Sequence, residues 1–244
     1  MDILWLGIFL LSGYLFGSIS FARIITKIVS PQEDLNSVEL PDMTTGESFT
    51  LKTVGATTAS VKLGPKYGGI IGVLDILKGF LPTLIVYLIF PNDYYHLAVG
   101  IGIVIGHIWP LYFKFRGGGG LSSALGSLLA IAPLGILACV VLAFVIGMLL
   151  LKNIAIAVLG GPFLFIFWSL LIIRDPYITI FSGLIILALL LATIPDLMVY
   201  FRAIKEGKGS INLMSMMDVI PMGKMMKKMM EKMGLSKDEE VESE

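Results

Sequence analysis

The chain has 244 residues, of which 56% are hydrophobic and only 15% charged, and its mean hydropathy is +0.89. Soluble proteins contain about a quarter charged residues, so this composition excludes an ordinary soluble enzyme, a nucleic-acid-binding protein and a disordered scaffold. The single cysteine, Cys139, excludes a disulfide framework and a cysteine-rich metal site. We expect a protein embedded in the lipid bilayer, with no nucleic-acid partner, metal or cofactor.

Apolar runs predict an all-α, polytopic membrane bundle of about seven transmembrane helices. The first run, Ile3 to Ala22, is long enough to cross a bilayer at ~1.5 Å per residue and lacks the basic start of a signal peptide. A shorter run, Leu121 to Ala132, would be ~18 Å long as a helix and is a tilted span, a re-entrant segment or part of a longer helix. We count it as the seventh. The other spans are Gly69 to Phe90, Leu97 to Phe113, Leu134 to Leu151, Ile154 to Ile173 and Ile178 to Tyr200.

The basic residues predict the orientation of this bundle. The connections after the first, third and fifth spans carry Lys and Arg, whereas the opposite connections contain one basic residue, Arg174, beside Asp175. Lys and Arg favour the cytoplasmic side of a membrane. Seven spans with the N-terminus outside and the C-terminus in the cytoplasm therefore fit every connection, whereas six do not. We expect a multi-pass protein of the cell membrane.

Two parts of the chain differ in composition. Residues 1–204 are expected to form the transmembrane domain, with a solvated cytoplasmic loop at residues 31–53, and residues 205–244 a cytoplasmic tail. In the tail, methionines at steps of three and four predict an amphipathic helix over residues 219–233, followed by an acidic, disordered end. The methionine face could bind a protein partner, or the helix could lie on the anionic inner leaflet, which we favour.

Two ionisable residues occur within the second predicted span. Asp75 and Lys78 are three residues apart, so they share one helix face and can form an ion pair. Charges are costly inside a membrane and often mark a functional site. A pair that only locks two helices together explains the same residues, and the pair alone does not decide between these readings.

A second group of residues follows the third predicted span. His107 ends that span, and four consecutive glycines then lead into a helix start at Leu121. A histidine at a helix end is usually structural, and glycine runs are common in linkers. However, successive glycine amides at a helix N-terminus can bind an anion, and Lys114 and Arg116 flank this run. We therefore expect an anion site at Gly117, Gly118, Gly119 and Gly120.

Two further small-residue motifs face the same side of the membrane. Gly17-Ser18-Ile19-Ser20-Phe21 closes the first span, and Val54-Gly55-Ala56-Thr57-Thr58 leads past Lys62 into the second. Close helix packing is the simpler explanation of each motif. Together, the clusters on one face suit a site for an anionic, headgroup-sized substrate beside an acyl chain.

The order of these motifs resembles the integral-membrane, acyl-phosphate-dependent glycerol-3-phosphate acyltransferases, the PlsY-like family. The resemblance covers residues 1 to about 200 and leaves out the Met-rich tail. The family has Gly-Ser-Ile-Pro-Phe, Gly-Ser-Gly-Asn-x-Gly-Ala-Thr-Asn, Asp-x-x-Lys-Gly-x-x-Pro, Gly-His-x-Phe-Pro and Phe-Lys-Gly-Gly-Lys-Gly. This chain has Gly17-Ser18-Ile19-Ser20-Phe21, Gly55-Ala56-Thr57, Asp75-x-x-Lys78-Gly79-x-x-Pro82, Gly106-His107-x-x-Pro110 and Phe115-Arg116-Gly117-Gly118-Gly119-Gly120.

The chain departs from the family pattern at phosphate-binding positions. Leu51, Val61 and Gly119 stand where the family has serine, arginine and lysine, and Thr53 and Thr58 where it has asparagines. Each lost cation removes a contact worth ~1.5 to 3 kcal/mol. Lys52, Lys62 and Arg116 are neighbours that could compensate, although Lys62 is rotated by ~100° from position 61 on a helix.

The resemblance implies transfer of an acyl group from acyl phosphate to glycerol 3-phosphate, which forms lysophosphatidate for phospholipid synthesis, among membrane lipids. It implies catalytic roles for His107, Asp75 and Lys78, with His107 accepting or orienting a proton and Lys78 also supplying charge. The implied phosphate-binding residues are Gly117, Gly118, Gly119, Gly120, Arg116 and Lys62, and the implied pocket residues are Ser18, Gly55, Thr57 and Ser123. The alternative is a catalytically degenerate member that serves as a lipid-binding or partner-binding scaffold. A transporter fits less well, because the spans lack repeated polar residues.

Overall fold

The computed structural model describes residues 2–36, 38–41, 48–51, 53–151 and 153–205. A 3-10 turn, η1 (Leu111–Phe113), follows α5, and the π-helical segments η2 (Ile146–Leu150) and η3 (Ser169–Ile173) extend α7 and α8. The helices and strands are α1 (Ile3–Gly17), α2 (Phe21–Val29), β1 (Val38–Pro41), β2 (Ser48–Leu51), α3 (Ala56–Leu63), α4 (Pro65–Ile89), α5 (Tyr95–Ile108), α6 (Leu121–Ile131), α7 (Pro133–Val145), α8 (Ile154–Trp168) and α9 (Pro176–Lys205). The Met-rich tail lies outside the described residues.

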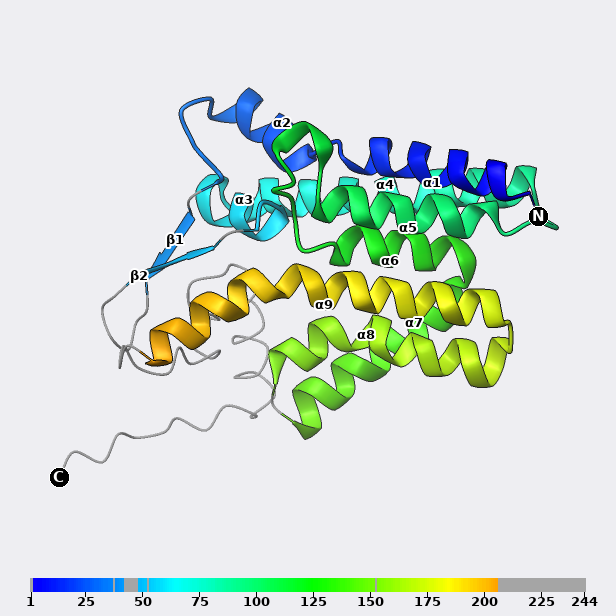
Figure 1. Ribbon diagram of the computed structural model, residues 1–244. Coiled ribbons are helices and arrows are strands. Elements are labelled where there is room, and N and C mark those ends of the chain that lie inside the picture. Colours follow the sequence, from blue (N-terminus) through cyan, green and yellow to red (C-terminus); the bar gives the residue numbers. More distant parts are fainter. Residues whose placement is uncertain (1, 37, 42–47, 52, 152, 206–244) are drawn as a thin grey trace.

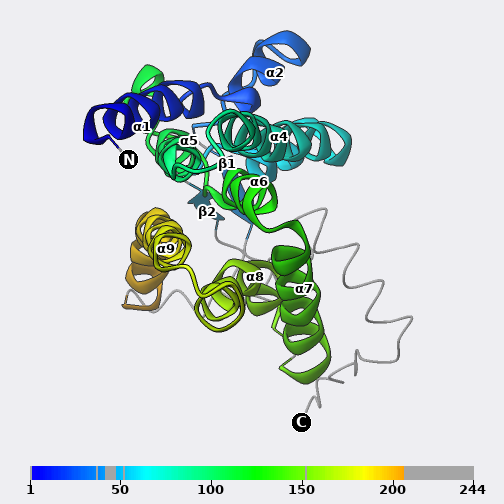
Figure 2. The same cartoon turned by 90° about the vertical axis from the view of Figure 1, so that its right-hand side faces the viewer.

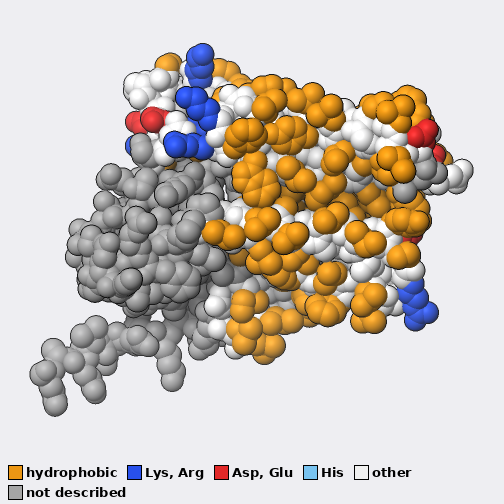
Figure 3. Space-filling view, in the orientation of Figure 1, with side chains coloured by type: hydrophobic (Ala, Val, Ile, Leu, Met, Phe, Trp, Pro, Cys, Tyr) orange, Lys and Arg blue, Asp and Glu red, His pale blue; other side chains and the backbone are white. Residues whose placement is uncertain are grey.

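Within the described residues, six segments are long and apolar enough to cross a membrane, and the predicted all-α membrane fold is confirmed. They are α1 with α2, α4, α5, α7 with η2, α8 with η3, and α9, whereas α6 is a separate apolar helix of 11 residues. The helices run side by side (Figure 1). Seen along their axes, α1, α4, α5 and α6 form one group and α7, α8 and α9 a second (Figure 2). Apolar side chains cover the flank in Figure 3, with charged side chains near its ends, as lipid contact requires.

Glycines allow α1 and α5 to cross with their backbones in contact. A Cβ atom added at Gly17 would collide with the Ile103 backbone, and one added at Gly106 would collide with the carbonyl oxygen of Tyr14. Small residues at such crossings are typical of membrane helices, which associate through close packing rather than through a hydrophobic driving force. This crossing places the end of α1 directly beside the end of α5, where His107 lies.

The chain breaks its helical path between α1 and α2. The Ser18 hydroxyl donates to the Tyr14 carbonyl at 2.8 Å and accepts from the Leu111 amide at 3.2 Å, while Ser20 caps α2 by accepting from the Arg23 amide. Serine at an N-cap competes well with helix continuation. The break leaves the carbonyl groups of Gly17 and Ile19 without helical partners, so they are available to a side chain from another helix.

The segment at residues 31–53, expected as a cytoplasmic loop, contains an antiparallel pair of strands. Val38 pairs with Leu51 and Pro41 with Ser48. Leu35 and Val38 are buried, and Leu35 packs in a small cluster with Ala22, Val54, Ala59 and Ile71. The many acidic residues of the segment suggest full exposure to solvent, so the sequence does not reveal that these two apolar side chains are buried. The hairpin stands at the same end of the bundle as the glycine run.

The opposite end of the bundle carries an aromatic cluster. The Tyr94 hydroxyl donates to an Asp175 carboxylate oxygen at 2.7 Å, and this hydrogen bond raises the pKa of Tyr94. The same carboxylate caps α9 by accepting from the Tyr177 amide at 2.8 Å. Four more aromatic rings pack nearby, with 5.2 to 6.0 Å between the centres of the rings in contact: Trp5, Phe9, Phe90 and Tyr95. Tyrosine and tryptophan favour membrane interfaces, so this end suits the interface opposite the basic connections.

Candidate active site

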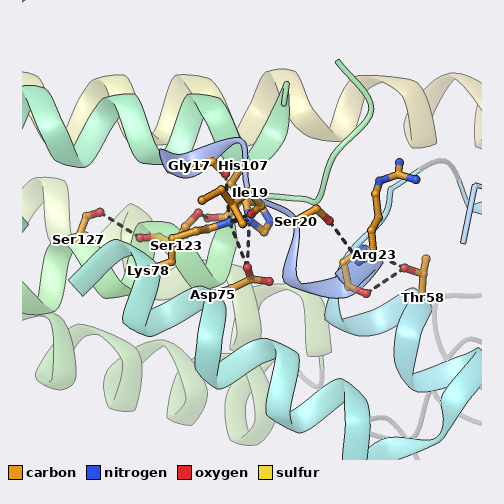
Figure 4. Close-up of polar contacts among 12 residues, drawn as sticks. Gly17, Ile19, Ser20, Arg23, Thr58, Asp75, Lys78, His107, Ser123 and Ser127 are labelled. Atoms are coloured by element: carbon orange, nitrogen blue, oxygen red, sulfur yellow. Dashed lines mark hydrogen bonds and ion pairs between the residues drawn. The ribbon is translucent and has the colours of Figure 1, made fainter. Parts of the chain in front are cut away.

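Three polar side chains meet between α4 and α5, and we call Asp75, Lys78 and His107 the polar cluster. The Lys78 Nζ atom lies 3.2 Å from Asp75 Oδ1 and 3.0 Å from His107 Nδ1, and Asp75 Oδ1 lies 3.4 Å from His107 Nδ1 (Figure 4). Asp75 and Lys78 are 2% and 3% exposed. The predicted ion pair is therefore present, and it includes the histidine that the sequence placed separately.

Lys78 is anchored by the break between α1 and α2. Its Nζ atom donates to the carbonyl oxygens of Gly17 at 3.1 Å and Ile19 at 2.9 Å. An ammonium group has three protons, and these two carbonyls with His107 Nδ1 can accept all of them. Asp75 then balances the charge. Lys78 therefore has no proton left for a substrate phosphate, which differs from the direct contact that the sequence suggested.

His107 is held with its two ring nitrogens in different surroundings. Nδ1 faces Lys78, which can only donate, so Nδ1 is the acceptor and the proton of the neutral ring is assigned to Nε2. Nε2 faces Gly118, since a Cβ atom added at Gly118 would collide with it. The longer contact, 3.4 Å to Asp75, adds charge without replacing that hydrogen bond. His107 thus directs an N–H group at the glycine run.

The glycine run folds back against the end of α5. Lys114 and Phe115 have φ of 53° and 60°, and this left-handed turn reverses the chain. The Gly118 amide then donates to the His107 carbonyl at 3.1 Å, and the Val54 amide donates to the Gly117 carbonyl at 2.7 Å. Two of the four glycines are therefore tied to the scaffold.

The other two glycines lead into α6. Gly120 has a φ of 82°, a conformation that favours glycine, and directly precedes the first residue of α6. Gly119 is exposed, and an added Cβ atom there would meet nothing within 4 Å. The N-terminus of α6 points its amides and the positive end of its dipole toward this open position. Gly119 is therefore the open position of the glycine run.

Of the two basic side chains expected to bind phosphate, Lys62 is engaged elsewhere. Its Nζ atom lies 3.2 Å from a carboxylate oxygen of Glu33. The Arg116 side chain is exposed, and its carbonyl oxygen accepts from Arg23 Nη2 at 3.0 Å. The structure therefore does not bring Lys62 to the polar cluster, and it draws attention to Arg23.

The four expected pocket residues have different surroundings. Gly55 lies against the glycine run, because a Cβ atom added there would be 3.6 Å from Gly118 Cα. Thr57 is exposed. Ser18 and Ser123 are fully buried, and the Ser123 hydroxyl donates to the Gly120 carbonyl at 3.0 Å. Their hydrogen bonds position the backbone around the site. Among the described residues, no group of three or more His, Cys, Asp or Glu could hold a metal ion.

Three contributors were not identified from the sequence as site residues. The carbonyl groups of Gly17 and Ile19 hold Lys78, and Arg23 contacts the loop before the glycine run. Ser20 is a usable signal in the sequence, because serine is a favoured N-cap residue and predicts a new helix start. In the sequence, Arg23 counts only among the basic residues after the first span, which predict the cytoplasmic side.

Comparison with known proteins decides the family. A family model described as glycerol-3-phosphate acyltransferase matches residues 7–206. The chain belongs to this family. It is 40% identical over 134 residues to the glycerol-3-phosphate acyltransferase of Aquifex aeolicus, covering 54% of this chain and 62% of the relative. It is 34% identical over 183 residues to glycerol-3-phosphate acyltransferase 2 of Bacillus anthracis, covering 75% and 88%.

A solved structure agrees with the family assignment. The crystal structure of PlsY (YgiH), an integral membrane glycerol 3-phosphate acyltransferase, in its glycerol 3-phosphate form matches with a TM-score of 0.65 at 25% identity. The match covers 83% of this chain and 93% of that chain. The curated relatives from Aquifex aeolicus and Myxococcus xanthus are matched over only 62% and 61% of their lengths.

Proposed function

We propose that the protein transfers a fatty acyl group from acyl phosphate to glycerol 3-phosphate and so forms lysophosphatidate at the cytoplasmic face of the membrane. The observation that carries this proposal is the orientation of His107, whose Nδ1 is held by Lys78 and whose Nε2 faces Gly118. A fixed N–H donor beside an open helix N-terminus suits a reaction between two anionic substrates. Family membership supports the same class of chemistry.

The reaction mainly requires that the protein position the two substrates and neutralise their negative charges. Acyl phosphate is a mixed anhydride and already a good electrophile. The glycerol 3-phosphate hydroxyl attacks its carbonyl carbon, the new ester C–O bond forms, and the bond from that carbon to the phosphate oxygen breaks. The hydroxyl proton leaves with the phosphate group, which becomes hydrogen phosphate. The protein supplies orientation and stabilises developing charge, which are the two large contributions to such a rate.

Each member of the polar cluster has a distinct role in this scheme. His107 donates from Nε2 to the oxygen on which negative charge develops. Lys78 is a positioning residue, because it fixes the His107 ring and its tautomer through Nδ1. Asp75 balances the charge of Lys78 inside the membrane. The acyl chain extends between helices into the bilayer.

The scaffold alternative rests on the departures at Leu51, Val61 and Gly119. The buried polar cluster supports an enzyme instead, since burying a charged pair and a histidine costs free energy that lipid binding alone does not require. A protein partner for the Met-rich tail stays a prediction, because the tail lies outside the described residues.

The direct test is an assay of purified protein in detergent with acyl phosphate and radiolabelled glycerol 3-phosphate. The expected product is labelled lysophosphatidate, and acyl-CoA in place of acyl phosphate controls for the donor. Absence of product with acyl phosphates of several chain lengths would favour the scaffold.

A further inference from the structure

We propose that Arg23 of α2 binds a phosphate group at the glycine run. The identity of the substrate rests on the proposed function, whereas the binding of a phosphate by Arg23 does not. The two lysines expected to supply positive charge to the phosphate already have partners in the protein. Lys78 donates to backbone carbonyls, and Lys62 pairs with Glu33. Arg23 is the basic side chain that contacts the loop leading into the run.

The guanidinium of Arg23 has unused hydrogen-bonding capacity. A guanidinium carries five N–H donors. Nη2 donates to the Arg116 carbonyl at 3.0 Å, while the Nε atom is buried and has no hydrogen-bond partner among the described residues. A buried donor without an acceptor is unfavourable. An anionic ligand would instead accept from the remaining N–H groups of Nη1 and Nη2, on the exposed side of the guanidinium.

The position of Arg23 suits a ligand at Gly119. Its Cζ atom lies 4.8 Å from the ring centre of Phe113, and this stacking together with the bond to Arg116 fixes the guanidinium beside the reversed loop. Figure 4 shows the Arg23 side chain directed away from the polar cluster. Arg116 precedes Gly119 by three residues, at most ~11 Å of extended chain, so a phosphate at Gly119 lies close to the loop that Arg23 contacts.

Asp34 is the acidic residue that could compete for Arg23. Its charge acts on the guanidinium, but the two residues form no ion pair within the described part of the chain. One oxygen of Asp34 instead accepts from the Asn36 amide at 2.9 Å and from the Asn36 side chain at 2.7 Å. The guanidinium is therefore available for the bidentate contact that arginine makes with phosphate.

Kinetics can identify which phosphate Arg23 binds. We would compare the parent with Arg23→Gln, with Arg23→Lys, which keeps the charge, and with Lys27→Gln. Lys27 is an exposed cation one turn further along the same helix, so its variant controls for loss of one charge. Arg23→Gln should raise one KM about ten- to hundredfold, the value of a charge-assisted hydrogen bond. Arg23→Lys should recover part of this effect, and Lys27→Gln should change neither KM.

Each kinetic outcome has one meaning. A higher KM for glycerol 3-phosphate alone assigns Arg23 to the acceptor phosphate, and a higher KM for acyl phosphate alone assigns it to the donor phosphate. Unchanged KM values for both substrates, or a fall in kcat alone, would overturn the inference, because a structural role lowers turnover without weakening one substrate selectively.

Calorimetric titration separates this inference from the proposed function. Glycerol 3-phosphate and inorganic phosphate are titrated into the parent and into Arg23→Gln in the same detergent, after thermal unfolding has shown that both are folded. Binding that weakens at least about tenfold in the variant supports the role of Arg23, even if the parent forms no lysophosphatidate. Equal affinities in the two proteins, or no binding of either ligand to the parent, would contradict it.

Discussion

The Nζ atom of Lys78 lies 3.0 Å from Nδ1 of His107. Because a protonated lysine can only donate, we assign the proton of the neutral imidazole to Nε2. The carbonyls of Gly17 and Ile19 take the remaining protons of the lysine. A charge buried in the membrane is thus used to orient a neighbouring side chain. In the proposed function, the polar cluster acts through the N–H group that His107 presents to Gly118.

The coupling between Asp75 and Lys78 should be measurable as a difference in the free energy of unfolding. Lys78→Met alone removes the lysine that balances the buried Asp75 carboxylate and should lower the free energy of unfolding by ~3 to 5 kcal/mol. Adding Asp75→Asn should recover part of that loss, but not all of it, because the carbonyls of Gly17 and Ile19 still lack a donor. Thermal unfolding in detergent measures the order of the three proteins. A double variant no more stable than Lys78→Met would show that the two residues are not coupled.

Two neighbouring glycines give a matched pair of variants. Gly118→Ala places a methyl group against His107 Nε2, whereas Gly119→Ala places one in open space. We expect kcat to fall at least about tenfold in Gly118→Ala, because a shift of the donor by a fraction of an ångström weakens transition-state contacts. Gly119→Ala, whose methyl group does not touch His107, should lower kcat less than Gly118→Ala does. Equal kcat values for the two variants would contradict the assigned direction of Nε2.

Impermeant thiol reagents can test the orientation of the bundle. Cysteines at Lys66, in the first turn of α4, and at Asn92, after its end, should be labelled from opposite sides of the membrane, with Asn92 outside. A cysteine at Gly207, beyond the described residues, should behave like the one at Lys66. The native Cys139 is 4% exposed, and its replacement by alanine removes any background. Labelling of Asn92 and Gly207 from the same side would contradict the seven-span topology.

Removal of the chain after Gly209 should leave the transmembrane domain folded. The predicted tail helix is amphipathic rather than apolar, so it should lie at the membrane surface and not inside the bundle. Size-exclusion chromatography and thermal unfolding in detergent would compare the truncated and full-length proteins. An aggregated or unfolded truncated protein would show that the Met-rich segment packs into the bundle.

The sequence predicts the spans well because membrane helices must be long, apolar and internally hydrogen-bonded. It also predicts that Asp75 and Lys78 meet, since their spacing fixes a common helix face. It could not predict that Lys78 bonds Gly17 and Ile19, because those carbonyls become available only where α1 ends and lies against another helix. Contacts between backbone groups and distant side chains leave no pattern along the chain.

The roles of charged residues are harder to predict from the sequence than the positions of the apolar spans. The sequence suggests Lys62 as a phosphate-binding residue because it neighbours position 61. In the structure Lys62 pairs with Glu33, and the sequence does not predict where the loop places that residue. Arg23 is one of several basic residues after the first span, and only the reversed loop after α5 shows that it contacts Arg116. A basic residue that marks topology and one that binds a ligand look alike until the fold brings their neighbours together.

The most direct test of the active centre is the initial rate of lysophosphatidate formation by the parent and by His107→Ala under identical conditions. If the His107 N–H group stabilises the developing charge, the variant should stay folded and lose at least about a hundredfold in kcat. A parent that forms product and a His107→Ala variant that matches its rate would contradict the role of the polar cluster.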